Sequence, residues 1–222
     1  MKYKAKLGKI AYLSANALIL KEQILQQAAA LFNRNGAETV SLRAIAAELG
    51  ISDGHLRYYF RTKEDILTAL FDRLEASISS QIPPEEFLIQ PEALTLSLYA
   101  SFDFLYEYRF FFQCSPAMYR KYPVLVQRLH TLKRVRGEQM LAVFGVFRRK
   151  GLLEPGTTTR QLEILFEQFF IISDSFIKYV SNGFYGNTEE EAKEAYLQIT
   201  LSLFIPYCTP YYREIFRDKT GT

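Results

Sequence analysis

The chain of 222 residues has two cysteines, two histidines and no tryptophan. Cys114 and Cys208 are far apart and outside any CxxC spacing, so neither a disulfide framework nor a zinc site is indicated, and a reducing compartment is favoured. His55 and His130 are too isolated to form a metal site. No apolar run approaches the ~20 residues that a membrane helix needs. We therefore expect a cytoplasmic protein that uses no metal and spans no membrane.

Catalytic signatures are also missing from the sequence. It contains no nucleophile–base pair, no paired acids and no phosphate-binding or cofactor-binding loop. The expectation is a protein that is not an enzyme and has no cofactor.

Positive charge is concentrated in the first third of the chain. Residues 1–63 contain ten Lys/Arg against four Asp/Glu, whereas residues 64–222 contain 17 against 20. A basic N-terminal third on a mildly acidic remainder predicts a polyanionic partner for that third.

The first 19 residues allow two interpretations. Four lysines precede the mostly apolar IAYLSANALIL, and Ala15-Asn16-Ala17 resembles a cleavage site for a secretory signal. The apolar stretch before that site is only about five residues, shorter than the usual ~7 to 15. Residues 1–19 are therefore expected to form a basic, frayed arm.

Helical periodicity extends through the remaining chain, and no convincing alternating strand is present. Pro83-Pro84, Pro91, Pro116, Pro123 and the Gly151–Gly156 segment divide the part beyond the fourth helix. The expected fold is all-α, with helices at residues 20–35, 42–49, 53–60, from 62 onward, 95–111, 124–150, 159–181 and 188–205.

Two of these short helices have the pattern of a helix-turn-helix. Ser41 and Ser52 are candidate N-caps, and Gly50 is a turn residue between the helices. The positions expected to point inward are apolar or small, and they are Ile45, Ala46, Leu49, Ile51, Leu56 and Tyr59.

In a helix-turn-helix the second helix enters the DNA major groove by its N-terminus, and the flanking residues contact phosphates. Asp53, Gly54, His55 and either Arg57 or Tyr58 are then candidates for base edges, while Tyr58, Arg61 and Lys63 suit phosphates. The candidate DNA-contacting residues are Ser41, Arg43, Ser52, Asp53, Gly54, His55, Arg57, Tyr58, Tyr59 and Lys63.

The segment from Ile24 to Leu74, ILQQAAALFNRNGAETVSLRAIAAELGISDGHLRYYFRTKEDILTALFDRL, resembles the DNA-binding domain of the tetracycline-repressor (TetR) family of bacterial transcription regulators. One departure is Arg57, where the family usually has a tyrosine that contacts a backbone phosphate. An arginine at this position can bind phosphate or read guanine with two hydrogen bonds.

The resemblance implies a particular architecture and mode of action. It implies a homodimer that places two recognition helices on a near-palindromic double-stranded DNA operator, and a C-terminal helical domain that binds a small molecule. In the family, ligand binding moves the fourth helix and changes the separation of the reading heads. The expected domains are an arm (1–19), a three-helix helix-turn-helix head (20–66) and a larger ligand-binding and dimerisation domain (67–222).

Aromatic residues are concentrated beyond the head, and 27 of the 33 Phe and Tyr residues lie in residues 64–222. Most of them could simply form the core. If a cavity exists, apolar and aromatic walls favour a hydrophobic or aromatic effector. The candidate cavity residues are Phe104, Tyr108, Phe111, Phe112, Tyr119, Phe144, Phe147, Phe166 and Phe170.

The last two expected helices, 159–181 and 188–205, are candidates for the dimer interface. The first has an apolar stripe wider than a lone surface helix needs, and two such helices from each protomer would form a four-helix bundle. The alternative is that both belong to the core of one chain. The candidate interface residues are Leu162, Leu165, Phe169, Phe176, Leu197, Leu201 and Phe204.

The sequence therefore predicts a ligand-responsive transcriptional regulator, more often a repressor in this family. The alternative is a small-molecule-binding or interaction protein that does not use its helix-turn-helix on DNA. The basic run around KRVRGEQ, at residues 133–139, is expected to be a solvated helix face.

Overall fold

The computed structural model describes residues 2–79, 84–88, 90–186 and 188–220, and for residues 2–16 it describes the backbone only. The chain divides into two compact units. The N-terminal unit comprises Met1–Arg73 and Cys114–Tyr122, and the C-terminal unit comprises Leu74–Gln113 and Pro123–Thr222. In the described residues the regular structure is helical, apart from one isolated bridge between Leu153 and Cys208.

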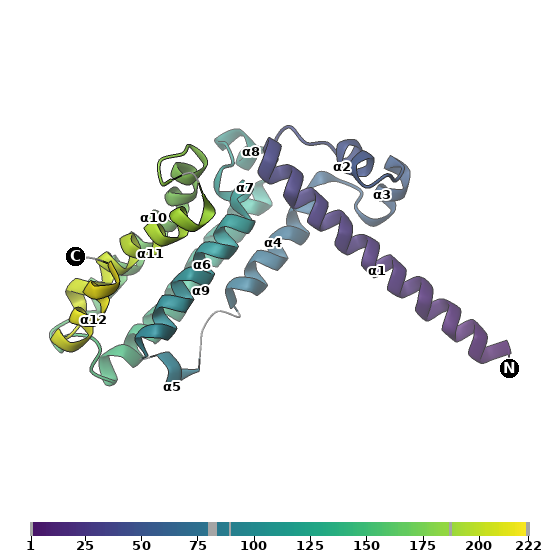
Figure 1. Cartoon of the computed structure of the whole chain (residues 1–222). Coiled ribbons are helices and arrows are strands. Elements are labelled where there is room, and N and C mark those ends of the chain that lie inside the picture. Colours follow the sequence, from purple (N-terminus) through teal and green to yellow (C-terminus); the bar gives the residue numbers. More distant parts are fainter. Residues whose placement is uncertain (1, 80–83, 89, 187, 221–222) are drawn as a thin grey trace. The chain divides into compact units, whose positions relative to one another are not determined.

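The N-terminal unit contains the head helices (Figure 1). They are α1 (Lys2–Asn35), α2 (Leu42–Glu48), α3 (Asp53–Tyr59), the first part of α4 (Lys63–Ser79) and α8 (Pro116–Lys121). Their side chains enclose a core that includes Ile24, Ala28, Phe32, Ile45, Leu56, Leu67, Phe71 and Met118.

The first helix is longer than expected. The frayed arm predicted for residues 1–19 is instead helical from Lys2, continuous with the helix expected at 20–35. The segment is rich in Lys, Ala and Leu, which are strong helix formers, and the first proline of the chain is Pro83. The helix ends where Gly36 adopts a φ of 81°.

The division between the units lies inside α4, after Arg73. The sequence-based boundary after residue 66 lies inside the same helix. The segment Cys114–Tyr122, assigned to the C-terminal domain from sequence, belongs to the N-terminal unit. There the backbone N–H of Ser115 donates to Oε1 of Glu38 at 3.1 Å.

The C-terminal unit is a bundle of long helices. The long members are α6 (Pro91–Glu107), α9 (Pro123–Arg149), α10 (Thr159–Ser181) and α11 (Glu189–Phe204). Shorter helices complete the unit, and they are α5 (Glu85–Leu88), α7 (Arg109–Phe112), the 3-10 helix η1 (Ile205–Tyr207) and α12 (Pro210–Thr220).

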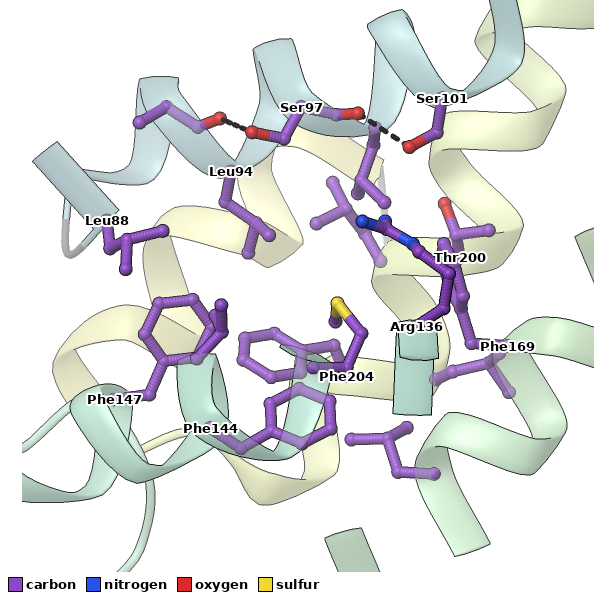
Figure 2. Close-up of a pocket in the computed structure, with 17 residues that line it drawn as sticks. Leu88, Leu94, Ser97, Ser101, Arg136, Phe144, Phe147, Phe169, Thr200 and Phe204 are labelled. Carbon is purple, nitrogen blue, oxygen red and sulfur yellow. Dashed lines mark hydrogen bonds between the residues drawn. The ribbon is translucent and has the colours of Figure 1, made fainter. Parts of the chain in front are cut away.

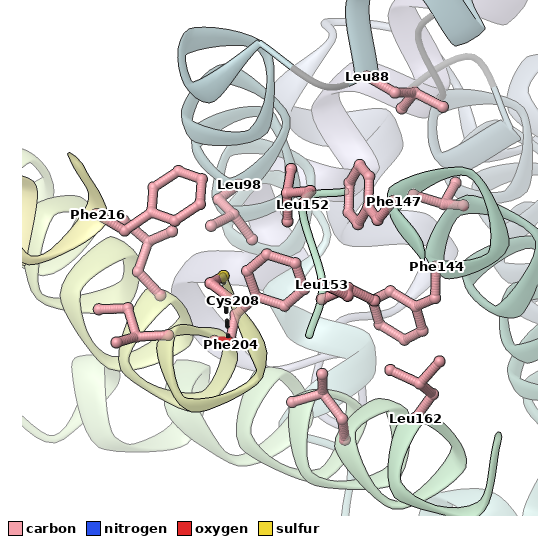
Figure 3. Packing of buried hydrophobic residues seen from close by; sticks show 14 of the residues in the cluster. Leu88, Leu98, Phe144, Phe147, Leu152, Leu153, Leu162, Phe204, Cys208 and Phe216 are labelled. Atoms are coloured by element: carbon pink, nitrogen blue, oxygen red, sulfur yellow. Dashed lines mark hydrogen bonds between the residues drawn. The ribbon is translucent and has the colours of Figure 1, made fainter. Parts of the chain in front are cut away.

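One apolar cluster joins the ends of these helices (Figure 3). It brings Phe144 and Phe147 of α9 against Phe204 of α11, with ring centroids 6.2 and 5.6 Å from that of Phe204. Phe216 inserts from α12, a helix that the sequence pattern did not predict. Burial of the Phe216 side chain in this cluster holds α12 against the bundle.

Candidate functional site

The helix-turn-helix has the caps and the turn that the sequence predicts. The Ser41 hydroxyl accepts the N–H of Ala44 at 3.2 Å, and the Ser52 hydroxyl accepts the N–H of His55 at 3.1 Å. Between the helices, Gly50 has a φ of 66°, a conformation that suits glycine. The N–H of Ile51 then reaches back to the carbonyl of Ala46 at 3.0 Å and closes the end of α2.

The outward face of α3 lies open to solvent. Leu56 is fully buried and anchors the helix, whereas Gly54, His55 and Tyr58 are exposed, with Tyr58 81% exposed. Tyr59 is half-buried, and its ring contacts the rings of His55 and Tyr58. The ring centroids are 5.8 Å apart for His55 and 5.2 Å apart for Tyr58. An exposed helix end with its side chains held in place suits entry into a DNA groove.

Arg57 is already engaged within the head. Its Nε donates to Oδ2 of Asp53 at 2.7 Å, and its Nη1 donates to the carbonyl of Arg61 at 3.0 Å. An isolated carboxylate at the N-terminal turn of α3 would repel DNA phosphates. The pairing with Arg57 neutralises this carboxylate, and the guanidinium of Arg57 keeps N–H donors that these two hydrogen bonds do not use.

The ammonium group of Lys63 is already hydrogen-bonded within the head. Its Nζ donates to the carbonyls of Ala37 at 2.7 Å and Glu38 at 3.1 Å. Burial, and then the charge of Lys121, lower the pKa of Lys63. An ammonium has three N–H donors, so one remains for a phosphate.

The other candidate DNA residues occupy the same unit and are accessible. Ser41, Arg43 and Ser52 are exposed, as is Arg61. At the start of α4, Thr62 and Asp65 cap each other: the Thr62 N–H donates to Asp65 at 2.9 Å, and the Asp65 N–H donates to Thr62 at 3.1 Å.

A cavity lies within the C-terminal unit, between α6, α9, α10 and α11 (Figure 2). The cavity has a volume of about 90 Å³, which is enough room for several water molecules. Its polar lining consists of Ser97, Ser101, Arg136 and Thr200, and the remaining lining is Leu88, Ala93, Leu94, Leu98, Met140, Val143, Phe144, Phe147, Leu165, Phe169, Leu201, Leu203 and Phe204.

A second cavity of about 60 Å³ shares part of this wall. Ser101, Arg136, Met140 and Phe169 line both cavities. The two spaces therefore meet around these four side chains.

The predicted cavity residues have different fates. Phe144 and Phe147 line the first cavity, and four others line the second, namely Phe104, Phe112, Phe166 and Phe170. Tyr108 and Phe111 are buried but line neither cavity. Tyr119 lies on α8 in the N-terminal unit and lines neither cavity.

Arg136 was not predicted to line a cavity. Its run on α9 was expected to be a solvated face, which holds for Arg134 but not for Arg136, since the latter is only partly exposed and borders both cavities. The sequence signal was its register: Leu132, Arg136 and Met140 are successive positions at i, i+4 spacing on the inward face of α9. Burial lowers the pKa of Arg136.

The predicted dimer-interface residues belong to the core of one chain. Leu162, Leu165, Phe176, Leu197, Leu201 and Phe204 are buried within the protomer, and Phe169 lines the cavities. The stripe on α10 is wide because the helix is apolar on two faces. The outward face carries Ile164 and Ile171, which are 41% and 59% exposed.

The described residues hold no cluster of three or more His, Cys, Asp or Glu side chains that could bind a metal ion. No helix in the described part of the chain is long and apolar enough to cross a membrane. Burial raises the pKa of the Cys208 thiol to about 12, so this cysteine is inert near neutral pH.

Comparison with known proteins agrees with this arrangement. Residues 24–70 match the sequence family described as "Bacterial regulatory proteins, tetR family", and residues 58–216 match the family described as "Bacterial transcriptional repressor". The second match alone spans more than half of the chain.

Solved structures with the same fold include a TetR-family transcriptional regulator from Marinobacter aquaeolei VT8, with 26% identity and a TM-score of 0.81 over 90% of this chain and 97% of that one. The ketosteroid regulator KstR2 of Mycobacterium tuberculosis is 16% identical, with a TM-score of 0.62 over 85% and 95%. SmeT, the repressor of the Stenotrophomonas maltophilia efflux pump SmeDEF, is 16% identical, with a TM-score of 0.60 over 86% and 91%. The chain therefore belongs to the TetR family of bacterial DNA-binding transcription regulators, which are transcription factors and not enzymes.

Proposed function

We propose that the protein represses transcription by binding a near-palindromic operator as a homodimer, and that a small hydrophobic or aromatic molecule releases it. The observation that carries the proposal is the outward face of α3, where Gly54, His55 and Tyr58 are exposed while the caps on Ser41 and Ser52 fix both helices. Such a helix reads base edges, and the neighbouring residues Arg43, Arg61 and Lys63 supply charge for phosphates.

Two heads on one operator require a dimer. An exposed apolar face of α10 and the turn after it supports this step. Ile164, Ile171, Tyr179 and Phe184 are 41%, 59%, 50% and 69% exposed in the single chain. Because Ile164 and Ile171 are seven residues apart on one helix, they share a face, and an apolar face of this kind is typical of a protein interface.

The two cavities of the C-terminal unit supply the effector site. Their walls are largely apolar and aromatic, which favours a hydrophobic ligand. A solved structure that shares the fold is a complex of SmeT with triclosan. A ligand changes DNA affinity only if it binds one conformer better than the other.

The fourth helix is the element through which the ligand would act. Its residues Lys63–Arg73 belong to the N-terminal unit and its last residues, from Leu74, belong to the C-terminal unit. A shift of α4 changes the separation of two recognition helices that must match half-sites about one DNA turn, ~34 to 36 Å, apart.

Selection of bound sequences from a random double-stranded DNA pool tests the proposal. The full chain should enrich an inverted repeat whose half-site centres are about one turn apart, and its affinity for that repeat should fall steeply with salt. Enrichment of no sequence would instead favour a small-molecule-binding or interaction protein that does not use its head on DNA.

A further inference from the structure

Arg136 places a cation at the junction of the two cavities. Figure 2 shows its guanidinium at the end of the first cavity where Ser101 and Thr200 also lie. Met140 and Phe169 line both spaces, and the second cavity adds the polar side chains of Ser173, Asp174 and Tyr196. An arginine in such surroundings needs an explanation, because a buried charge is costly unless it is paired.

No carboxylate pairs with Arg136 among the residues that the structure describes. Both of its hydrogen bonds come from Nη1, to the carbonyl of Ile78 at 3.4 Å and to Oε1 of Gln139 at 3.1 Å. Asp174, which lines the second cavity, pairs with Lys178 at 3.4 Å. The guanidinium therefore keeps donors at Nε and Nη2 that no described side chain uses.

The hydroxyls of the first cavity cannot replace Arg136 as donors to a ligand. Ser97 donates to the carbonyl of Ala93 at 2.8 Å, and Ser101 donates to the carbonyl of Ser97 at 2.8 Å. Thr200 donates to the carbonyl of Tyr196 at 2.7 Å. A hydroxyl has one proton, so these three groups face the cavity as acceptors only. Arg136 is then the donor that this cavity offers.

We propose that the effector is an organic anion, an apolar body that ends in one carboxylate, and that this carboxylate pairs with Arg136. The planar guanidinium fork matches a planar carboxylate through two parallel hydrogen bonds. A phosphate monoester would bring up to two negative charges to a site with one cation. This inference rests on the proposed function, because it takes the two cavities to be the effector site.

The same pairing gives the ligand a route to α4. Ile78 lies in the last turn of that helix, where backbone carbonyls lack helical partners. The Nη1 of Arg136 supplies one of those partners. A carboxylate that pairs with Nε and Nη2 shares this guanidinium with the end of α4, so the ligand is linked to α4 through one side chain.

Calorimetric titration of the full chain at pH 7 with matched probes tests the assignment. The probes are octanoate, decanoate and dodecanoate against the alcohols of the same length, and 2-naphthoate against 2-naphthol. At least one acid should bind at least ten times more tightly than its alcohol. In Arg136→Met that preference should vanish, whereas Arg134→Met, an exposed arginine two residues away on α9, should keep it.

Thermal unfolding without ligand adds a readout that does not depend on the choice of probe. Arg136→Met removes an unpaired, partly buried cation at the cost of a long hydrogen bond of 3.4 Å to the carbonyl of Ile78, so the Tm of this variant should rise. A lower Tm, or a variant that does not fold, would make Arg136 a structural residue and overturn the assignment. Failure of every acid to bind, or equal binding of acid and alcohol by the wild type, would overturn it as well.

Operator binding separates this inference from the proposed function. If acids bind through Arg136 but leave operator affinity unchanged, the anion site stands and the effector role of the cavity falls. If alcohols bind as tightly as acids and release the operator, the effector role stands and the carboxylate assignment falls.

Discussion

Single side chains in the head combine two tasks, and Arg57 is the clearest case. It stands where the family usually has a tyrosine, and it pairs with Asp53 on the same helix. Because the pair is exposed, its contribution to folding is small, on the order of 0.5 kcal/mol. We expect its contribution to DNA binding to be larger, since an unpaired Asp53 at the N-terminal turn of α3 would repel phosphates.

We expect Arg57→Ala to weaken operator binding by ~1 to 3 kcal/mol, because a contact is lost and a carboxylate is uncovered. Asp53→Asn in the same background should recover part of this loss. Binding titrations of both variants and the double variant form the test. A double variant as weak as Arg57→Ala would show that Arg57 does not act by neutralising Asp53.

Lys63 divides its donors between the head itself and, in our proposal, a phosphate. Lys63→Ala should therefore lower the free energy of unfolding by about 1 kcal/mol and reduce the salt slope of DNA binding by about one. Arg61→Ala, an exposed neighbour, should reduce the slope equally and leave stability unchanged. Equal stability of the two variants would contradict the structural role of Lys63.

At the scale of elements, α8 is held in the N-terminal unit by a short polar contact. Glu38 accepts hydrogen bonds from Ser115, and these bonds lower the pKa of Glu38. A carboxyl whose pKa is lower in the folded state stabilises that state above its unfolded pKa, about 4.3, and loses this effect as the pH falls through the folded value.

Glu38→Ala should therefore speed hydrogen exchange of the backbone amides in Pro116–Lys121, because the helix loses its attachment. Glu38→Gln keeps an acceptor oxygen and should change these rates much less. Mass spectrometry of exchanged peptides at pH 7 measures both. Unchanged rates in Glu38→Ala would show that the contact between Glu38 and Ser115 does not hold α8.

The elements that sequence could predict are those with strong local signals. Serine caps and Gly50 fix α2 and α3, and the predicted span of 159–181 matches α10 because Thr158 caps it. Short helices such as α8 were missed, because a six-residue helix shows too little periodicity. The inward position of Arg136 was missed because a charged side chain is expected to face solvent. Only the register of the whole helix places this side chain on the inward face.

Periodicity also reveals an apolar face without revealing its partner. From sequence, the stripe through Leu162, Leu165 and Phe176 favours a dimer interface, with the core of one chain as the alternative. Within one chain it packs against α9, α11 and the cavities. Only the three-dimensional arrangement shows that Ile164 and Ile171 are the residues left outside.

At the scale of the whole molecule, the proposed dimer depends on that outer face. We expect Ile171→Glu to yield monomers in sedimentation, because a buried charge opposes association of apolar surfaces. Leu96→Glu, which alters a side chain of similar exposure on α6, should leave the dimer intact. A dimer that survives Ile171→Glu would place the interface elsewhere.

The proposed function depends above all on base reading by the exposed residues of α3. The most direct measurement is the affinity of wild type and His55→Ala for the selected operator and for every single base-pair variant of it. We predict that His55→Ala loses ~1 to 3 kcal/mol of discrimination at one symmetric pair of positions and keeps it elsewhere. Equal weakening on all variants, or no change on any, would contradict base reading by this residue.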